Sequence, residues 1–72
     1  MAYWDNEIIQ AGANARASGQ SMFDNPYLRS EELPAQSGIS LEVWQSRHDA
    51  WHHGYEMEDM VRMNKGETRY IL

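Results

Sequence analysis

Three residues whose types could bind a metal recur at intervals of four positions along the chain: His48, His52 and Glu56. Residues four apart lie on one face of an α-helix, so these side chains could meet. Two neutral imidazoles one turn apart can chelate Zn²⁺ or Ni²⁺, and a carboxylate can complete the set. The competing interpretation is a solvated polar face carrying ordinary histidines. The HExxH motif does not occur, and we expect no cofactor.

Other catalytic patterns are scarce. The G-x-S-x-G nucleophile motif does not occur, and neither does a P-loop. A chain of 72 residues forms at most one domain, and it has little mass with which to enclose a substrate pocket. We therefore expect a protein that acts by binding and is not an enzyme.

The charge of the chain limits the class of partner. Eleven acidic residues oppose six basic ones, for a net charge of -5, and cysteine is absent. Because affinity for nucleic acid comes largely from Lys and Arg, this balance disfavours non-specific binding to DNA or RNA and favours a protein partner. The N-terminus lacks the basic and apolar regions of a signal peptide, and no apolar run approaches the length of a membrane span. A cytoplasmic protein without a membrane segment is expected.

The hydrophobic pattern predicts two helices. The first spans about residues 5–18, with Asp5 as its N-cap and Gly19 as a left-handed residue that ends it. The second spans about residues 41–64, starting after Ser40 and ending at Gly66. Between them, residues 19–40 lose helical periodicity at Pro26, Pro34 and Gly38, which predicts a long irregular linker that packs on the helices. The predicted fold is an all-α helix-loop-helix domain over residues 1–66, with a flexible tail over 67–72.

Small residues on both predicted helices indicate a close helical contact. Gly12 and Ala15 share one face of the first helix, and Gly54 lies in the apolar arc of the second. Glycine costs a helix interior about 1 kcal/mol relative to alanine, so its placement there favours backbones that approach closely.

The second helix also carries an aromatic stripe, which could form the core or an exposed interface. The stripe consists of Trp44, Trp51 and Tyr55. A helix over residues 41–64 would be about 36 Å long, more than the first helix can cover. An edge of this helix would therefore remain for a second copy of the chain or for another partner. That edge comprises Val43, Ala50, Met57 and Val61.

The order of these small and aromatic residues resembles the ribosome modulation factor family, which groups with the small CrpP ciprofloxacin-resistance proteins. The shared pattern is a helix with glycine and alanine, a Pro-Tyr turn, a linker and a Trp-x-x-Gly-aromatic helix, over about residues 8–60. The residues that carry it are Gly12, Ala15, Gly19, Asn25, Pro26, Tyr27, Trp51, Gly54 and Tyr55.

This resemblance implies two helices joined by a linker, in a small regulatory protein that binds stoichiometrically to the ribosome or to another host complex. Ribosome modulation factors are strongly basic and bind small-subunit RNA, whereas this chain is acidic in the matching region. RNA binding would require folding to gather the arginines on one face: Arg16, Arg29, Arg47 and Arg62. The CrpP resemblance adds a third interpretation, the ATP-dependent modification of fluoroquinolones.

A hypothesis from a different class is an acidic inhibitor or adaptor, encoded by a phage or plasmid, that binds a basic surface on a host protein. The two leading hypotheses differ in the surface that they require. Ribosomal RNA binding needs a basic stripe, and the inhibitor needs contiguous acidic residues.

Overall fold

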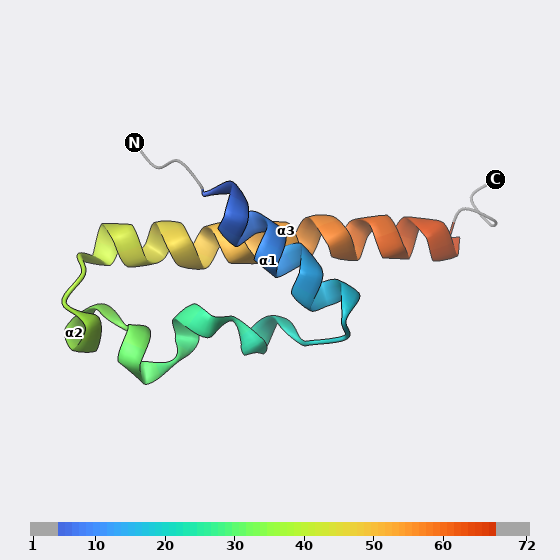
Figure 1. Cartoon of the computed structure of the whole chain (residues 1–72). Helices are drawn as coiled ribbons and strands as arrows, with labels where there is room; N and C mark the ends of the chain where they lie inside the picture. The colour runs from blue at the N-terminus through green and yellow to red at the C-terminus, as the bar shows by residue number, and fades with distance from the viewer. Residues whose placement is uncertain (1–4, 68–72) are drawn as a thin grey trace.

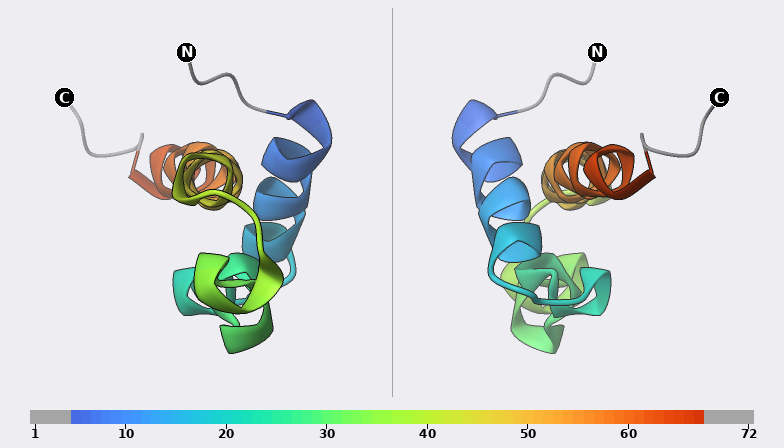
Figure 2. Two further views of the ribbon diagram at one scale, coloured as in Figure 1. Left: turned by 90° about the vertical axis from the view of Figure 1, so that its left-hand side faces the viewer. Right: turned by 90° about the vertical axis from the view of Figure 1, so that its right-hand side faces the viewer.

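The computed structural model describes residues 5–67, and their side chains as far as Met63. Two long helices, α1 (Asn6–Ala17) and α3 (Leu41–Glu67), are joined by a linker over residues 18–40. Helix α1 crosses the middle of α3, and the linker runs alongside the N-terminal half of α3 (Figure 1). Views along α3 place α1 beside it and the linker below both (Figure 2). The described residues contain no strand, which confirms the expected all-α helix-loop-helix.

Helix α1 begins and ends within one residue of the predicted bounds. The Asp5 carboxylate accepts a hydrogen bond from the Glu7 amide at 2.8 Å and caps the N-terminus. At the other end Gly19 takes the left-handed conformation, with φ of 91°. The amides of Gly19 and Gln20 reach back to the last carbonyls of the helix, at 3.1 and 3.0 Å. This is a Schellman arrangement, and it explains why the residue at position 19 is glycine.

The linker is more regular than the predicted irregular segment. It contains three 3₁₀ turns, η1 (Met22–Asp24), η2 (Pro26–Leu28) and η3 (Ser30–Glu32), and the four-residue helix α2 (Pro34–Ser37). Each turn starts after a non-helical residue, and these residues recur every fourth position, at 21, 25, 29 and 33. Both prolines occupy the first position of a turn, where the missing amide N–H costs nothing.

Helix α3 starts as predicted, because the Ser40 hydroxyl accepts a hydrogen bond from the Val43 amide at 3.1 Å. The prediction that Gly66 ends the helix is wrong, since α3 continues through Gly66 to Glu67. Glycine ends a helix by adopting a positive φ, and among the described glycines only Gly19 and Gly38 do so. Glu67 therefore belongs to the helix and not to the predicted tail, and residues 68–72 lie outside the described residues.

The crossing of α1 and α3 is a contact between backbones. A Cβ atom on Gly12 would overlap the carbonyl oxygen of Trp51, and one on Gly54 would overlap the carbonyl of Ile9. Each helix thus supplies one glycine and one carbonyl to the contact. On α1 Gly12 follows Ile9 by three residues, and on α3 Gly54 follows Trp51 by three residues. Ala15 and Ala50 are buried beside this contact. The predicted close approach of the two helices is confirmed.

In the described part of the chain, no helix combines the length and the apolar character needed to cross a membrane.

Candidate interaction surfaces

The aromatic stripe on α3 lies mostly inside the molecule. Trp51 and Tyr55 are buried, and their rings stack with centroids 5.5 Å apart. The Tyr55 hydroxyl donates a hydrogen bond to the Gln20 carbonyl at 2.7 Å, which ties α3 to the chain just after α1. The half-buried Trp44 donates its indole N–H to the Tyr27 carbonyl at 2.8 Å. These contacts support the core interpretation of the stripe.

The Asn-Pro-Tyr turn fastens the linker to α3. Asn25 is only 2% exposed, and its side chain bonds in two directions. Its Oδ1 accepts a hydrogen bond from the Tyr27 amide at 3.0 Å, while its Nδ2 donates to the His48 carbonyl at 3.3 Å. Tyr27 packs against the core, and its burial raises the pKa of the phenol above the ordinary value. Asn25 is a buried polar link that the turn pattern alone did not predict.

The residues that carry the family resemblance therefore have structural roles in this chain. Gly12, Ala15 and Gly54 form or flank the crossing, and Gly19 ends α1. The remaining residues form the core or fasten the linker to α3: Asn25, Pro26, Tyr27, Trp51 and Tyr55. The shared residue pattern therefore indicates how the chain folds. The surface that contacts a partner must be sought among other residues.

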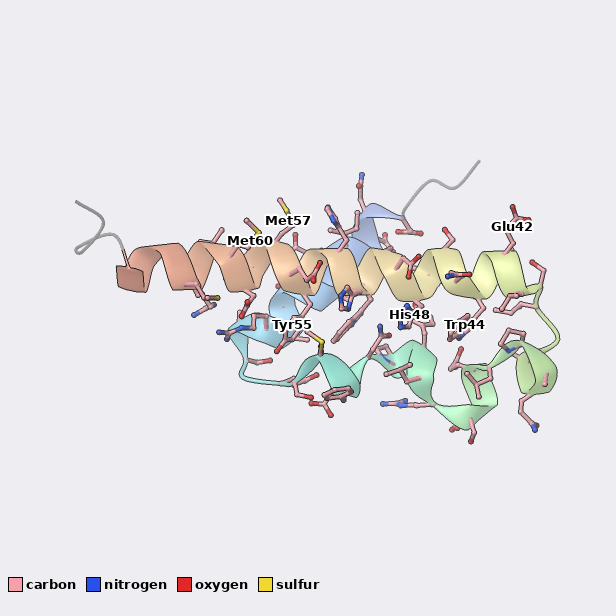
Figure 3. All side chains as sticks on the ribbon, turned by 180° about the vertical axis from the view of Figure 1, so that it is seen from behind. Glu42, Trp44, His48, Tyr55, Met57 and Met60 are labelled. Atoms are coloured by element: carbon pink, nitrogen blue, oxygen red, sulfur yellow. The ribbon has the colours of Figure 1, made fainter. Side chains whose placement is uncertain are left out.

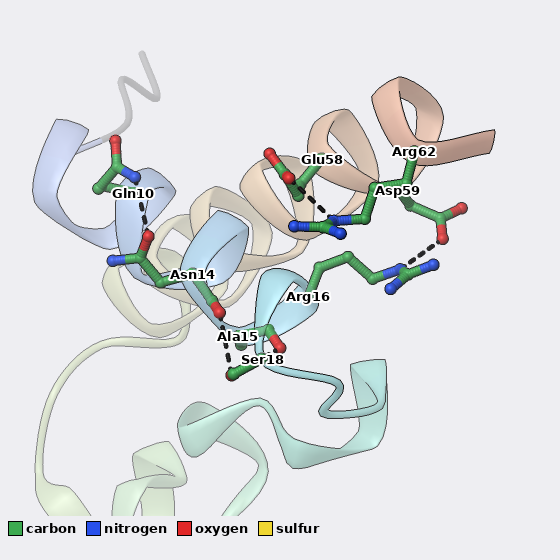
Figure 4. A network of polar contacts seen from close by, with 8 residues as sticks. All are labelled: Gln10, Asn14, Ala15, Arg16, Ser18, Glu58, Asp59 and Arg62. Carbon is green, nitrogen blue, oxygen red and sulfur yellow. Dashed lines mark hydrogen bonds and ion pairs between the residues drawn. The ribbon is translucent and has the colours of Figure 1, made fainter. Parts of the chain in front are cut away.

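Folding does not gather the four arginines into a basic stripe. The Arg16 Nε of α1 lies 2.7 Å from an Asp59 oxygen, and the Arg62 Nε lies 3.0 Å from a Glu58 oxygen (Figure 4). The hydrogen bond to Asp59 raises the pKa of the Arg16 guanidinium. Arg29 belongs to the linker, and Arg47 precedes Arg62 by about four helical turns, or about 22 Å. Two of the four guanidiniums are thus neutralised by carboxylates of α3.

The predicted metal ligands His48, His52 and Glu56 do not form a metal site. Among the side chains that the structure describes, from Asp5 to Met63, no group of three His, Cys, Asp or Glu residues is arranged to hold an ion. His48 Nδ1 is instead 3.0 Å from Asp49, and His52 Nε2 is 3.2 Å from Glu56. The two imidazoles stack with centroids 6.2 Å apart, and Trp44 lies 5.2 Å from His48. Each histidine turns to its own carboxylate, so the spacing produces a stacked ladder and not a chelate.

The face of α3 that points away from the linker carries a row of carboxylates. Glu42, Asp49 and Glu56 recur every seven residues, which places them on one line along the helix. In Figure 3, Glu42 and Met60 point away from the linker, whereas His48 points toward it. Arg47 and Arg62 lie more than 100° around the helix from this row, as the helical repeat of 100° per residue requires. The described face is therefore acidic.

Beyond the crossing, the C-terminal end of α3 is uncovered on one side. Met57, Met60 and Val61 are 53%, 58% and 49% exposed, while Ala50 of the same predicted edge is covered by α1. Val43 of the predicted edge is also exposed, at 42%, so the exposure of the edge is confirmed at Val43, Met57 and Val61, and the prediction is wrong at Ala50. Met60 was missed, although its spacing of three from Met57 was a signal for a shared helical face. We call Met57, Met60 and Val61 the apolar face of the free end.

The linker also presents exposed apolar residues, of which Phe23 is the most exposed. Phe23 is 81% exposed on turn η1. Ser21 and Asp24 hold this turn with reciprocal side-chain bonds, from the Phe23 amide to Ser21 at 3.0 Å and from the Ser21 amide to Asp24 at 2.8 Å. A hollow of about 230 Å³ adjoins Phe23 and Arg29, and another of about 340 Å³ lies between α1 and the linker. Both hollows are open to solvent and have Asp24 and Arg29 in their walls.

Comparison with known proteins identifies no relative: no family model matches the chain, and no curated protein or solved structure resembles it at a significant level.

Proposed function

We propose that this chain is a small, non-catalytic regulatory protein of the cytoplasm, which acts by stoichiometric binding to a protein surface of a host complex. The observation that carries the proposal is the distribution of charge on α3. Carboxylates line one face of α3 at Glu42, Asp49 and Glu56, the last two beside histidines. Arg16 and Arg62 are instead tied to acidic partners. Such a surface attracts basic groups and repels phosphate. The partner expected from this charge is a basic protein.

Ribosome binding, as in the ribosome modulation factor family, is a second candidate. It is favoured by one observation, which is that the residues of the resemblance meet in a single packed unit around Gly12 and Gly54. A shared pattern of this kind supports a shared fold, and a fold can carry a different surface in each member of a family. In this chain the ribosomal contact would have to come from ribosomal proteins, because two arginines are already paired with carboxylates.

Affinity capture from bacterial lysate tests both candidates. The bait is the purified chain, the control is nuclease treatment of the lysate, and the readout is mass spectrometry with quantitation. We expect one protein at near-equal stoichiometry that survives nuclease. Recovery of the set of small-subunit ribosomal proteins, reduced by nuclease to the ribosomal protein bound directly, would instead support the ribosomal candidate. Failure to retain any protein above the level of an unrelated acidic bait would contradict the proposal.

A further inference from the structure

The free end of α3 has two chemically different sides. Glu58, Asp59 and Arg62 are engaged in two ion pairs, Asp59 with Arg16 of α1 and Glu58 with Arg62 of its own helix (Figure 4). Met57 and Val61 each follow by seven residues a position at the crossing, Ala50 and Gly54, so they continue that stripe beyond the cover of α1. With Met60 they form the apolar face, and each of these three side chains is about half exposed. Figure 3 shows Met57 and Met60 pointing away from the linker. This end of α3 is therefore an amphipathic helix whose charged side chains are ion-paired and whose apolar side chains are half exposed.

We infer that this apolar face is the docking element of the protein, and that it inserts into an apolar groove on a partner protein whose rim carries lysine or arginine. The inference rests on the proposed function and names the surface that performs it. Anchors at spacings of three and four are the means by which a helix is recognised in a groove. Methionine suits such a contact because its flexible thioether adapts to irregular surfaces.

The charge of the surface decides between a basic groove and a second copy of the chain. Glu56 borders the apolar face with its side chain 57% exposed, and the carboxylate row of α3 leads to it. Two copies, each with a net charge of -5, would bring like charges together. A rim of lysine or arginine would instead complement Glu56 and the acidic row. Charge complementarity therefore favours a basic partner.

The size of the apolar face leads to the same partner. Three half-exposed side chains offer an apolar patch of at most a few hundred Å². A stable interface buries about 800 Å² on each partner, so this patch is too small for a flat self-contact. A groove that receives the helix end would also cover its flanks and so reach the required area. Because α3 projects beyond α1 (Figure 1), the flanks of the helix end are accessible to such a groove.

Site-specific photo-crosslinking tests the inference. A benzophenone amino acid replaces Met60 in one variant, Leu41 at the other end of α3 in a matched control, and Phe23 in a third variant; all three residues are exposed. Each variant is irradiated in bacterial lysate, and mass spectrometry identifies the crosslinked peptide. We expect a crosslink from position 60 alone, to an apolar segment flanked by lysine or arginine in a different protein.

The partner so identified is then purified and titrated with two charge-introducing variants. Met60→Glu should weaken binding at least 30-fold, whereas Leu41→Glu should change it less than twofold, with the circular dichroism of both variants unchanged. A crosslink from position 23 alone, a crosslinked pair of this chain, an acidic partner segment, or equal affinity of the two variants would each overturn the inference. A crosslink from position 23 alone leaves the proposed function standing, whereas the absence of any crosslinked or captured protein contradicts both.

Discussion

The middle and the C-terminal end of α3 are both helical, but the first is buried and the second is half exposed. Around Ala50 and Gly54 the helix is buried under α1, and the backbones approach so closely that a Cβ atom does not fit. From Met57 onward, apolar side chains of similar hydrophobicity stand half exposed. Helix α1 has 12 residues and is about 18 Å long, so it cannot cover the 27 residues of α3, which extend about 40 Å. The crossing fixes the fold, and the uncovered half is available for other contacts.

The largest loss of stability is expected from a substitution in the buried core beneath the crossing. Trp51→Ala removes a side chain that is almost fully buried and stacked on Tyr55. We expect a loss of roughly 3–5 kcal/mol in the free energy of unfolding, which approaches the whole stability of a small domain. Urea denaturation followed by circular dichroism measures this loss. A folded Trp51→Ala variant with an unchanged denaturation midpoint would place Trp51 outside the core.

The next effect compares two glycines of the same helix. Gly54→Ala places a Cβ atom against the Ile9 carbonyl, and the two helices must separate to accept it. We expect a loss of roughly 2–3 kcal/mol, even though alanine favours a helix by about 1 kcal/mol over glycine. Gly66→Ala, in the last turn of α3, is the control and should increase the helical signal because alanine has the higher helix propensity.

Thermal unfolding of both variants, monitored at 222 nm, measures the difference. The two variants should differ in the sign of the change in unfolding temperature, because replacing glycine with alanine should destabilise the chain at position 54 and not at position 66. A Gly54→Ala variant as stable as the parent chain would mean that the helices do not meet through their backbones at this position.

The sequence predicted the crossing well because the relevant signal is local. Gly12 and Gly54 each lie in an apolar helical arc, where glycine has no use except to let another backbone approach. The starts of both helices were also predictable, since Asp5 and Ser40 are capping residues that act on amides two or three positions away.

Other features depend on contacts that no local pattern specifies. The histidine spacing was compatible with a metal site. In the structure, however, His48 pairs with Asp49 and His52 pairs with Glu56 of the same helix. Asn25 had the signature of a turn, and its buried bond to the His48 carbonyl depends on where the linker passes α3. The end of α3 was misplaced because Gly66 is helical, and sequence alone does not decide between a helical and a left-handed glycine.

A smaller effect tests how the linker is fastened to the buried half. Asn25→Ala removes the bond to the Tyr27 amide and the bond to the His48 carbonyl, and we expect a loss of about 1–2 kcal/mol. Asn25→Asp is the matched variant, because it keeps an acceptor for the Tyr27 amide but faces the His48 carbonyl without a donor. Chemical denaturation of both variants measures the two bonds separately. If Asn25→Asp were as stable as the parent chain, the link to α3 would contribute nothing.

The smallest effect on stability is expected in the uncovered half. Met60→Ser changes a side chain that is 58% exposed, so the free energy of unfolding should change by less than about 0.5 kcal/mol. Amide hydrogen exchange sharpens the comparison within a single molecule. A short helical segment without tertiary packing is marginal in water, so amides at Met60 to Met63 should exchange faster than those at Trp51 to Tyr55. Equal protection of the two segments, or a large loss of stability in Met60→Ser, would mean that the end of α3 is covered in solution, and the contrast between the two halves of the helix would then be lost.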